Sequence, residues 1–493
     1  MLKKLEFKRE HAFVAGNWIS ADSGRTFDVT DPATGERLGS VPDCGRAETA
    51  RAISAADAAF AGWRGKTAKE RSRLLHRLAD IVDANNEALA TLMTMEQGKS
   101  LTEARGEATF SAYYVRWFAE EAQRVYGDVI PSPWAGRRIL VTKEPVGVVG
   151  AITPWNFPSS MIARKLGPAL AAGCTMVVKP ASQTPFSGLA WGALCEMAGI
   201  PPGVVNILTG SAREIGAELT SNPLVRKITF TGSTSVGKLL VEQASRGLKR
   251  VSMELGGNAP FIVFDDADLD RAVEGALAAK YRNSGQTCVC TNRLLVQAGI
   301  HDAFVARFAA AVDALKIGNG LEEGVQQGPL IDEKAVEMVE AHIADALAKG
   351  AKVVTGGKRH RLGGTFFQPT VVVGVTSEMA VAREETFGPM APVFRFDTEE
   401  EAVRLANDTE FGLASYFYTS DLGRAFRVAE GLKYGMVGIN EGIITTEVAP
   451  FGGVKESGMG REGSKYGIED YIEVKYICVG GLEASQAKGP RKT

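Results

Sequence analysis

Short runs of mostly apolar residues recur along the chain after residue 145, and each is followed by a turn signal and a segment that can be helical. A first series consists of GVVGAI (147–152), TMVVK (175–179), VVNIL (204–208) and KITF (227–230). Apolar strands separated by helices are typical of βαβ units, in which helices cover a parallel sheet. This series predicts an α/β domain.

A second series of apolar runs starts near residue 260. Helical stretches such as DEKAVEMVEAHIADALAKG (332–350) separate its members. The members are FIVF (261–264), RLLVQ (293–297), KVVTG (352–356), PVFRF (392–396) and MVGIN (436–440). The same reasoning predicts a second α/β domain.

Residues 67–93 have the pattern of one long amphipathic helix. Thr67 and Glu70 form a capping box, the sequence signal of a helix start. Apolar side chains then fall on one face at helical spacing, namely Leu74, Leu75, Leu78, Ile81 and Val82.

Two segments fit neither series, because apolar and polar residues alternate in them. They are RILVTKE (138–144) and YIEVKYICV (471–479). Alternation predicts strands with one polar face, and we interpret the pair as a projecting arm that forms an oligomer edge. The final residues, EASQAKGPRKT (483–493), have the composition of a frayed polar tail.

The totals exclude several classes of function. A chain of 493 residues with a net charge of −2 has no electrostatic basis for binding nucleic acid or a membrane surface. It contains no apolar run that approaches the roughly 20 residues of a membrane span. The N-terminal residues MLKKLEFKRE have neither a secretory nor a transit pattern, so we expect a cytoplasmic protein.

The cysteines and histidines predict neither a disulfide framework nor a metal site. Six cysteines are too few for such a framework in a chain of this length, and the five histidines never adopt ligand spacing. We interpret four of the cysteines as small buried hydrophobic residues: Cys44, Cys174, Cys195 and Cys478.

The remaining two cysteines stand one residue apart in YRNSGQTCVCTN (281–292). Cys288 follows Gly285, whose freedom allows a tight backbone path that can present a thiol to a cleft. Asn156, in TPWNFP (153–158), directly follows a predicted strand, where its amide can donate to a developing oxyanion. Each stretch alone favours a structural role, so support for a catalytic role has to come from elsewhere in the chain.

Three further stretches add candidate chemistry. Lys179 ends a predicted strand, and its ammonium can hold ribose or phosphate. FTGSTSVGK (230–238) has the pattern of a strand followed by a Gly-rich turn and a helix, and the N-terminus of such a helix favours the binding of a phosphate. Glu254 precedes Gly256 in apolar surroundings, which raise a carboxyl pKa and suit a general base.

Taken together and in order, the motifs resemble the aldehyde dehydrogenase superfamily from about residue 10 to about residue 480. They are TPWNFP, KPASQTP, FTGSTSVGK, MELGGNAP, GQTCVC, EETFGP and PFGGVKESGMGREG. Within the superfamily the chain is most similar to the NADP-dependent succinate-semialdehyde dehydrogenases. That likeness rests on Tyr281-Arg282-Asn283 before GQTCVC, on GPLIDEKAV and on EGSKYGIEDY.

The resemblance implies a fold and an assembly. A Rossmann-type cofactor domain would comprise residues 1–128 and 146–256, and a second α/β catalytic domain would comprise residues 257–463. A β oligomerisation arm and tail would comprise residues 129–145 and 464–493 of a homodimer or homotetramer.

The resemblance also implies catalytic roles. Cys288 would be the nucleophile, Asn156 and the Cys288 backbone N–H would stabilise the oxyanion, and Glu254 would activate water. The positions that match cofactor contacts of the family are Trp155, Lys179, Ser182, Gly232, Ser233, Leu255, Glu385 and Phe387.

Cofactor and substrate preference follow from a few of these positions. Ser182 stands where NAD-preferring relatives often carry an acidic residue, and its hydroxyl can donate to a 2′-phosphate, so we expect NADP to be preferred over NAD. Arg164 and Arg282 match arginines that bind the carboxylate of succinate semialdehyde. Thr445 and Thr446 fall where the family usually has a serine, and the extra methyl narrows the pocket.

Two alternative functions stay open. The first is oxidation of glutarate semialdehyde or another aldehyde by an enzyme of the same superfamily, and the second is a catalytically silent structural protein.

The role of Cys290 is also open. It is either a small packing residue or the partner of Cys288 in a reversible disulfide that blocks the nucleophile.

Overall fold

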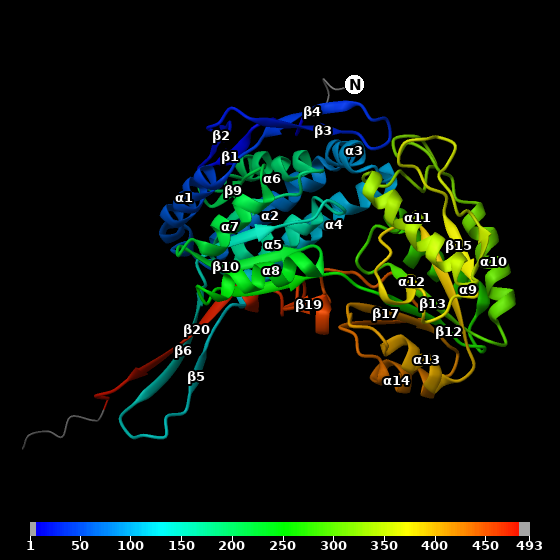
Figure 1. The fold of residues 1–493 in the computed structure, drawn as a ribbon. Coiled ribbons are helices and arrows are strands. Elements are labelled where there is room, and N and C mark those ends of the chain that lie inside the picture. The colour runs from blue at the N-terminus through cyan, green and yellow to red at the C-terminus, as the bar shows by residue number, and fades with distance from the viewer. Residues whose placement is uncertain (1–5, 483–493) are drawn as a thin grey trace, which may run out of the picture.

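The computed structural model describes residues 6–482 as two α/β bodies and a projecting arm (Figure 1). In the described part of the chain, the first body is built on an eight-stranded sheet with the strand order β19-β11-β10-β7-β8-β9-β1-β2. Its strands are β1 (Ala12–Val14), β2 (Asn17–Ile19), β7 (Val148–Ile152), β8 (Thr175–Lys179), β9 (Val205–Ile207), β10 (Val225–Thr231), β11 (Arg250–Glu254) and β19 (Gly458–Met459).

The five central strands of this sheet are parallel, as the first series of apolar runs predicts. The strands β1 and β19 join antiparallel at either side. Parallel register brings the carboxyl ends of β7, β8, β10 and β11 to one edge, where an open α/β sheet binds its ligands.

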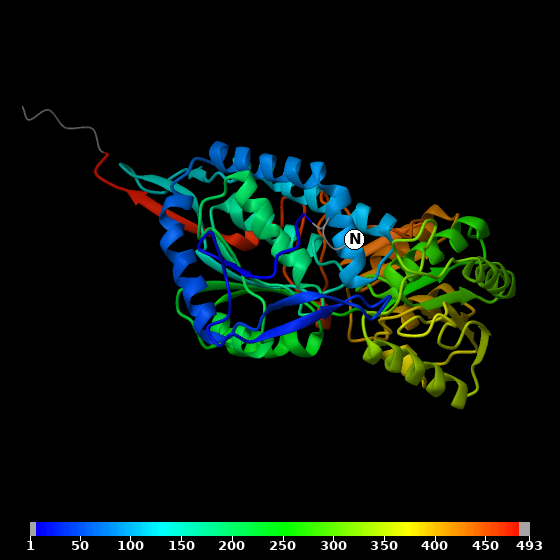
Figure 2. The same cartoon turned by 90° about the horizontal axis from the view of Figure 1, so that it is seen from above.

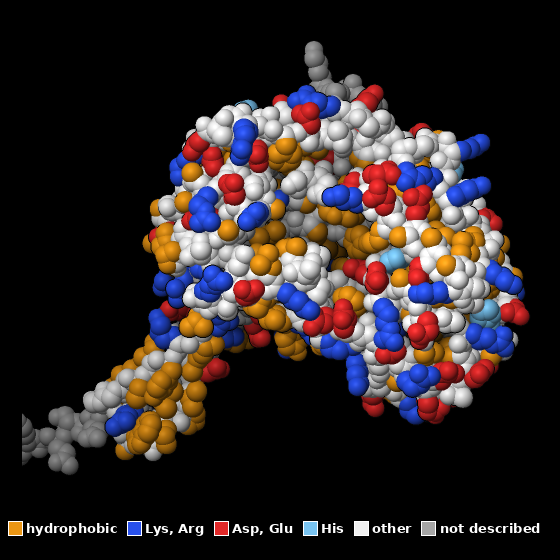
Figure 3. All heavy atoms as spheres, in the orientation of Figure 1, with side chains coloured by type: hydrophobic (Ala, Val, Ile, Leu, Met, Phe, Trp, Pro, Cys, Tyr) orange, Lys and Arg blue, Asp and Glu red, His pale blue; other side chains and the backbone are white. Residues whose placement is uncertain are grey.

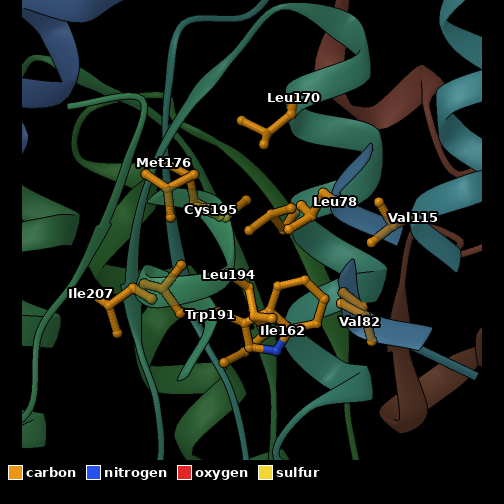
Figure 4. Packing of buried hydrophobic residues seen from close by; sticks show 14 of the residues in the cluster. Leu78, Val82, Val115, Ile162, Leu170, Met176, Trp191, Leu194, Cys195 and Ile207 are labelled. Carbon is orange, nitrogen blue, oxygen red and sulfur yellow. The ribbon is translucent and has the colours of Figure 1, made fainter. Parts of the chain in front are cut away.

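Helices cover both faces of the first sheet, which explains why its strands are apolar throughout. One face packs in a core cluster with α1 (Arg46–Arg64), α7 (Ala212–Ser221) and α8 (Thr234–Ser245). The other face packs with α2 (Ala68–Ala84), α3 (Asn86–Gln97), α4 (Leu101–Glu121), α5 (Ser160–Ala172) and α6 (Pro185–Ala198). Figure 4 shows part of this second layer, in which Trp191 and Leu194 of α6 meet Ile162 of α5 and Leu78 of α2.

The second body is built on a seven-stranded sheet with the strand order β14-β15-β16-β13-β12-β17-β18 over the described residues. All neighbouring pairs are parallel except the edge pair of β14 and β15. The strands are β12 (Ala259–Val263), β13 (Thr291–Gln297), β14 (Lys352–Thr355), β15 (Thr370–Val373), β16 (Met390–Phe396), β17 (Ala414–Tyr418) and β18 (Met436–Ile439).

Helices cover both faces of this sheet as well. One face packs with α9 (Leu269–Tyr281) and α10 (His301–Asp313). The other packs with α11 (Glu333–Ala348), α12 (Ala380–Arg383), α13 (Glu399–Asn407) and α14 (Leu422–Gly431). The two bodies also lie side by side when the molecule is seen from above (Figure 2).

The arm is a three-stranded antiparallel sheet with the strand order β20-β6-β5 in the described chain. It consists of β5 (Asp128–Ile130), β6 (Arg138–Pro145) and β20 (Ile472–Val479), so the two alternating segments do pair. It extends away from the second body in Figure 1, and its surface in Figure 3 is largely hydrophobic. Separately from the arm, β3 (Thr26–Thr30) and β4 (Arg37–Pro42) pair antiparallel as a two-stranded sheet.

The structure corrects two predictions. The single helix expected over 67–93 is two helices, because α2 ends at Ala84 and α3 starts at Asn86 after a break at Asn85. The capping box of Thr67 and Glu70 is present at the start of α2. Cys478 is exposed on the arm rather than buried, whereas Cys44, Cys174 and Cys195 are buried.

Two further observations concern the ends of the chain and membranes. The expected polar tail, residues 483–493, lies outside the described residues. No helix among residues 6–482 is both long enough and apolar enough to cross a membrane.

Candidate active site

Two cavities border Cys288, and the surface is hollowed where the two bodies meet (Figure 3). The first, called here the arginine cavity, has a volume of about 270 Å³. Its lining includes Arg164, Arg282, Thr445 and the rings of three phenylalanines, Phe110, Phe157 and Phe451.

The second, called here the tryptophan cavity, has a volume of about 250 Å³. It is lined by most of the positions expected to contact a cofactor, together with Asn156 and Glu254: Trp155, Gly232, Ser233, Leu255, Glu385 and Phe387. Because Cys288 lines both cavities, groups bound in them would meet at its sulfur.

An unusual backbone path presents Cys288 at this junction. Asn283, Ser284 and Gly285 have φ of 52°, 55° and 76°, so the chain stays in the left-handed region for three residues. A Cβ at Gly285 would lie 2.1 Å from the Gly388 carbonyl oxygen, so only glycine fits there. The sequence indicates the glycine, but nothing in it signals the two strained residues before it.

The Cys288 thiol is half-buried, and burial raises its pKa to about 12. The positive charge of Arg164 opposes that rise, whereas the carboxyl groups of Glu385 and Glu254 add to it. The thiol is therefore neutral at pH 7, and it needs a base or a further positive charge to become the thiolate that attacks carbonyl carbon.

Asn156 follows β7 and is 3% exposed. Its side-chain Nδ2 donates to the carbonyl oxygen of Gln286 at 3.0 Å, two residues before Cys288. An amide nitrogen has a second proton, and Asn156 lines the tryptophan cavity beside Cys288. This placement suits a donor to an oxygen that develops charge next to the sulfur.

Glu254 ends β11 and is 3% exposed. Neither of its oxygens has a hydrogen-bond partner within residues 6–482. Burial raises the pKa of Glu254 well above its usual range, and the negative charge of Glu462 raises it further. The raised pKa expected from the sequence is confirmed, and it suits a group that must take up a proton near neutral pH.

Sequence reasoning missed Glu462 and Lys165, which lie beside these groups. The Lys165 ammonium donates to Glu462 and to the Thr231 hydroxyl, and Arg164 lies 2.9 Å from the other oxygen of Glu462. Burial alone would raise the pKa of Glu462, but the two cations outweigh it and lower that pKa. Lys165 directly follows Arg164 and Glu462 stands inside PFGGVKESGMGREG, yet only the fold brings these two stretches together.

The tryptophan cavity has features that suit a dinucleotide. The rings of Trp155 and Phe387 meet edge-on, with centroids 5.6 Å apart. Glu385 accepts from the Gly257 N–H at 3.0 Å, and burial raises its pKa to about 7. A Cβ at Gly256 would lie 2.8 Å from a Glu385 oxygen, so glycine keeps this space open.

Lys179 and Ser182 lie outside the lining of both cavities but face each other. Lys179 ends β8, and its Nζ donates to the Ser182 hydroxyl at 3.4 Å. Burial lowers the pKa of Lys179 to about 8, while Ser182 is exposed. An ammonium beside an exposed hydroxyl can hold a phosphate or a ribose.

The expected carboxylate-binding residues have different surroundings. Arg164 is buried, paired with Glu462, and its guanidinium lies 3.8 Å from the centroid of the Phe451 ring. Arg282 is half-buried and has no ion pair among the described residues. Thr445 lines the arginine cavity, but Thr446 does not, and the Thr446 hydroxyl donates to Glu447 instead.

Cys288 and Cys290 are both free thiols. Cys290 is 2% exposed, and its sulfur lies 3.8 Å from the Arg282 carbonyl oxygen. Burial also raises the pKa of Cys290. The buried position fits the packing role, and the reversible disulfide stays a prediction.

The chain resembles known proteins over nearly its whole length. The family model described as "Aldehyde dehydrogenase family" matches residues 18–477. A glutarate-semialdehyde dehydrogenase of Pseudomonas aeruginosa is 64% identical over 98% of this chain and 100% of that protein. An NADP-dependent succinate-semialdehyde dehydrogenase of Escherichia coli is 61% identical over 96% of this chain and 98% of that protein.

A solved structure agrees with these matches. A crystal structure of succinate-semialdehyde dehydrogenase from Burkholderia pseudomallei superimposes with a TM-score of 0.95 at 63% identity. The superposition covers 96% of this chain and 98% of that one.

Proposed function

The chain belongs to the aldehyde dehydrogenase family, an NAD(P)-dependent group of oxidoreductases, and we propose that it oxidises short aldehydes that carry a terminal carboxylate. Succinate semialdehyde is the first candidate, and glutarate semialdehyde is the second because a relative named for it is 64% identical. The observation that carries the proposal is a cavity that joins Cys288 to two arginines, one of them without an ion pair in the described chain.

The residues present fit a nicotinamide dinucleotide. The open space at Gly256, the Trp155 and Phe387 rings and the start of α8 after Ser233 supply room, apolar contact and free backbone N–H groups. When bound, the cofactor accepts a hydride from the substrate carbon. Glu385 would hold its ribose.

The chain's own residues would perform the other steps. Once a base has taken its proton, the Cys288 thiolate attacks the aldehyde carbon, and the carbonyl oxygen becomes an oxyanion that accepts from Asn156 and from the Cys288 N–H. Loss of hydride leaves a thioester on Cys288. Glu254 takes a proton from water, which attacks the thioester and releases the acid and the thiol.

We also propose that NADP is preferred over NAD. Ser182 offers a hydroxyl where a carboxylate would repel a 2′-phosphate, and the Lys179 ammonium lies 3.4 Å from it. The name of the E. coli relative, NADP-dependent, supports this assignment.

The arm supports a proposal about assembly. Val474 and Tyr476 of β20 are 68% and 58% exposed, and β20 stands at the edge of its sheet. An exposed apolar strand at an open edge invites pairing with another chain. We propose that the arm joins copies of this chain into a homodimer or homotetramer.

The function is tested by measuring reduced nicotinamide formed by the purified protein. Succinate semialdehyde, glutarate semialdehyde and the uncharged butyraldehyde are compared, each with NADP and with NAD. We expect the highest kcat/KM for succinate semialdehyde with NADP. Turnover of butyraldehyde at least as efficient as that of both semialdehydes would overturn the arginine assignment and leave the Cys288 chemistry intact.

A further inference from the structure

A buried ion pair lies beneath the loop that carries Asn156. Lys99, which directly precedes Ser100 at the start of α4, donates from its ammonium to Glu107 of α4. Their side chains are 0% and 1% exposed. A buried pair of this kind carries a large desolvation cost, so what else the two groups hold indicates why they are there.

The pair holds both ends of the turn that leads from Asn156 into α5. Lys99 Nζ donates to the Asn156 carbonyl oxygen at 2.7 Å and lies 3.9 Å from the centroid of the Phe157 ring. Glu107 accepts from the backbone N–H groups of Ser159 and Ser160 at 2.9 and 3.1 Å. The backbone on both sides of Phe157 and Pro158 is thus tied to α4 and to the residue just before its N-cap.

The same carbonyl connects this turn to the Cys288 loop. Asn283 Nδ2 donates to the Asn156 oxygen at 3.0 Å and to the Gln286 oxygen at 3.2 Å. The Gln286 oxygen also accepts from the Asn156 side chain. Lys99 therefore fixes the peptide that sets the direction of the Asn156 amide relative to Cys288.

Helix capping alone does not account for the lysine. Glu96 caps α6 in the same manner, because it accepts from the N–H groups of Phe186 and Ser187 at 2.9 and 2.6 Å. No Lys or Arg side chain pairs with Glu96 within residues 6–482. Burial raises the pKa of Glu96 to about 8, so a buried carboxyl can cap a helix start in this fold without a lysine. Capping therefore does not by itself require Lys99, whose ammonium also holds the Asn156 carbonyl.

We propose that Lys99, held by Glu107, is a positioning residue that aligns the Asn156 amide with the oxyanion formed at Cys288. This inference rests on the proposed role of Asn156. It does not depend on which aldehyde is the natural substrate.

A double-mutant cycle tests it with any aldehyde that the parent protein oxidises. The pair is neutralised together, as Lys99→Met with Glu107→Gln, so that no unpaired charge stays buried. We expect kcat to fall about 10- to 100-fold with KM little changed, because misplacing an oxyanion donor acts on the transition state. Asn156→Ala alone should lower kcat about 100- to 1000-fold.

The combination of the three substitutions decides the matter. If Lys99 acts through Asn156, adding the neutralised pair to Asn156→Ala should lower kcat by less than about threefold more. Losses that multiply would overturn the inference, as would an unchanged kcat in the neutralised pair. If Asn156→Ala itself keeps full kcat, the proposed oxyanion role fails, and that failure is visible in the single variant.

A matched control separates positioning from loss of stability. Arg71 is another buried cation whose guanidinium donates to backbone carbonyls, and one of them, Ala171 at 3.0 Å, is at the far end of α5. Arg71→Met should lower Tm but leave kcat within about twofold. Alkylation of Cys288 by iodoacetamide should keep its rate in the neutralised pair, and a large change there would place the effect on the Cys288 loop and overturn the inference.

Discussion

Replacing Arg282 by alanine should weaken the recognition of a charged aldehyde far more than that of a neutral one. The Arg282 guanidinium is half-buried, lines the arginine cavity with Cys288 and forms no ion pair in the part of the chain that the structure describes. Its charge is therefore available to a substrate carboxylate. Arg164 lines the same cavity but is already paired with Glu462.

The size of the effect follows from this contrast. A hydrogen bond to a charged group contributes about 1.5–3 kcal/mol, which corresponds to about 10- to 150-fold in kcat/KM. Arg282 keeps partial contact with water, so we expect the lower end of that range, about tenfold, mostly in KM. Arg164→Ala should cost more and should also lower kcat, because it leaves Glu462 with one cation fewer and removes a charge that favours the Cys288 thiolate.

The assay compares kcat/KM for succinate semialdehyde and for butyraldehyde, which has the same four carbons and no carboxylate. Arg282→Lys serves as the matched control, because it keeps the positive charge but loses the planar guanidinium that can form two hydrogen bonds to a carboxylate. The ratio of the two kcat/KM values should fall about tenfold in Arg282→Ala and less in Arg282→Lys. Equal losses for both aldehydes would refute the assignment of Arg282 to the substrate carboxylate.

Four further measurements test other parts of the proposal. Ser182→Glu should reverse the preference from NADP to NAD in kcat/KM, and an unchanged ratio would count against the role of that hydroxyl. Glu254→Gln should release about one reduced nicotinamide per subunit in a burst and then turn over about 100- to 10,000-fold more slowly, whereas loss of the burst itself would contradict a role confined to hydrolysis. Alkylation of Cys288 by iodoacetamide should keep accelerating about tenfold per pH unit above pH 9, where an ordinary thiol levels off, because burial raises its pKa to about 12. Val474→Lys with Tyr476→Lys should reduce the molar mass measured by light scattering, and an unchanged mass would exclude the arm as the interface.

Much of the fold could be predicted because its signals are local. The apolar runs at 175–179 and 293–297 fall within β8 and β13, since a strand covered on both faces must be apolar throughout. The capping box at Thr67 and Glu70 marks the first turn of α2 correctly. The break at Asn85 had a local signal that the prediction overlooked, because Asn85 and Asn86 interrupt the apolar spacing after Val82, and asparagine favours helix ends.

The candidate site likewise contains residues that the sequence marks and residues that it does not. The glycine at 285 marks the Cys288 loop, since its conformation excludes a side chain. Lys99, Lys165 and Glu462 carry no such mark, because a lone lysine or glutamate in a sequence is usually on the surface. Their burial and their partners, 297 residues apart for Lys165 and Glu462, exist only after the sheets are assembled.

The origin of the reacting groups explains why such buried links are needed. Glu254 ends β11 and Asn156 lies in the loop after β7, and parallel register brings the carboxyl ends of these two strands to one edge of the first sheet, whereas Cys288 belongs to the second body. Neither core alone fixes the distance between the thiol and its two partners. Hydrogen bonds between loops do so, notably from Asn156 to Gln286, and a substitution that loosens them should lower kcat while both cores keep their stability.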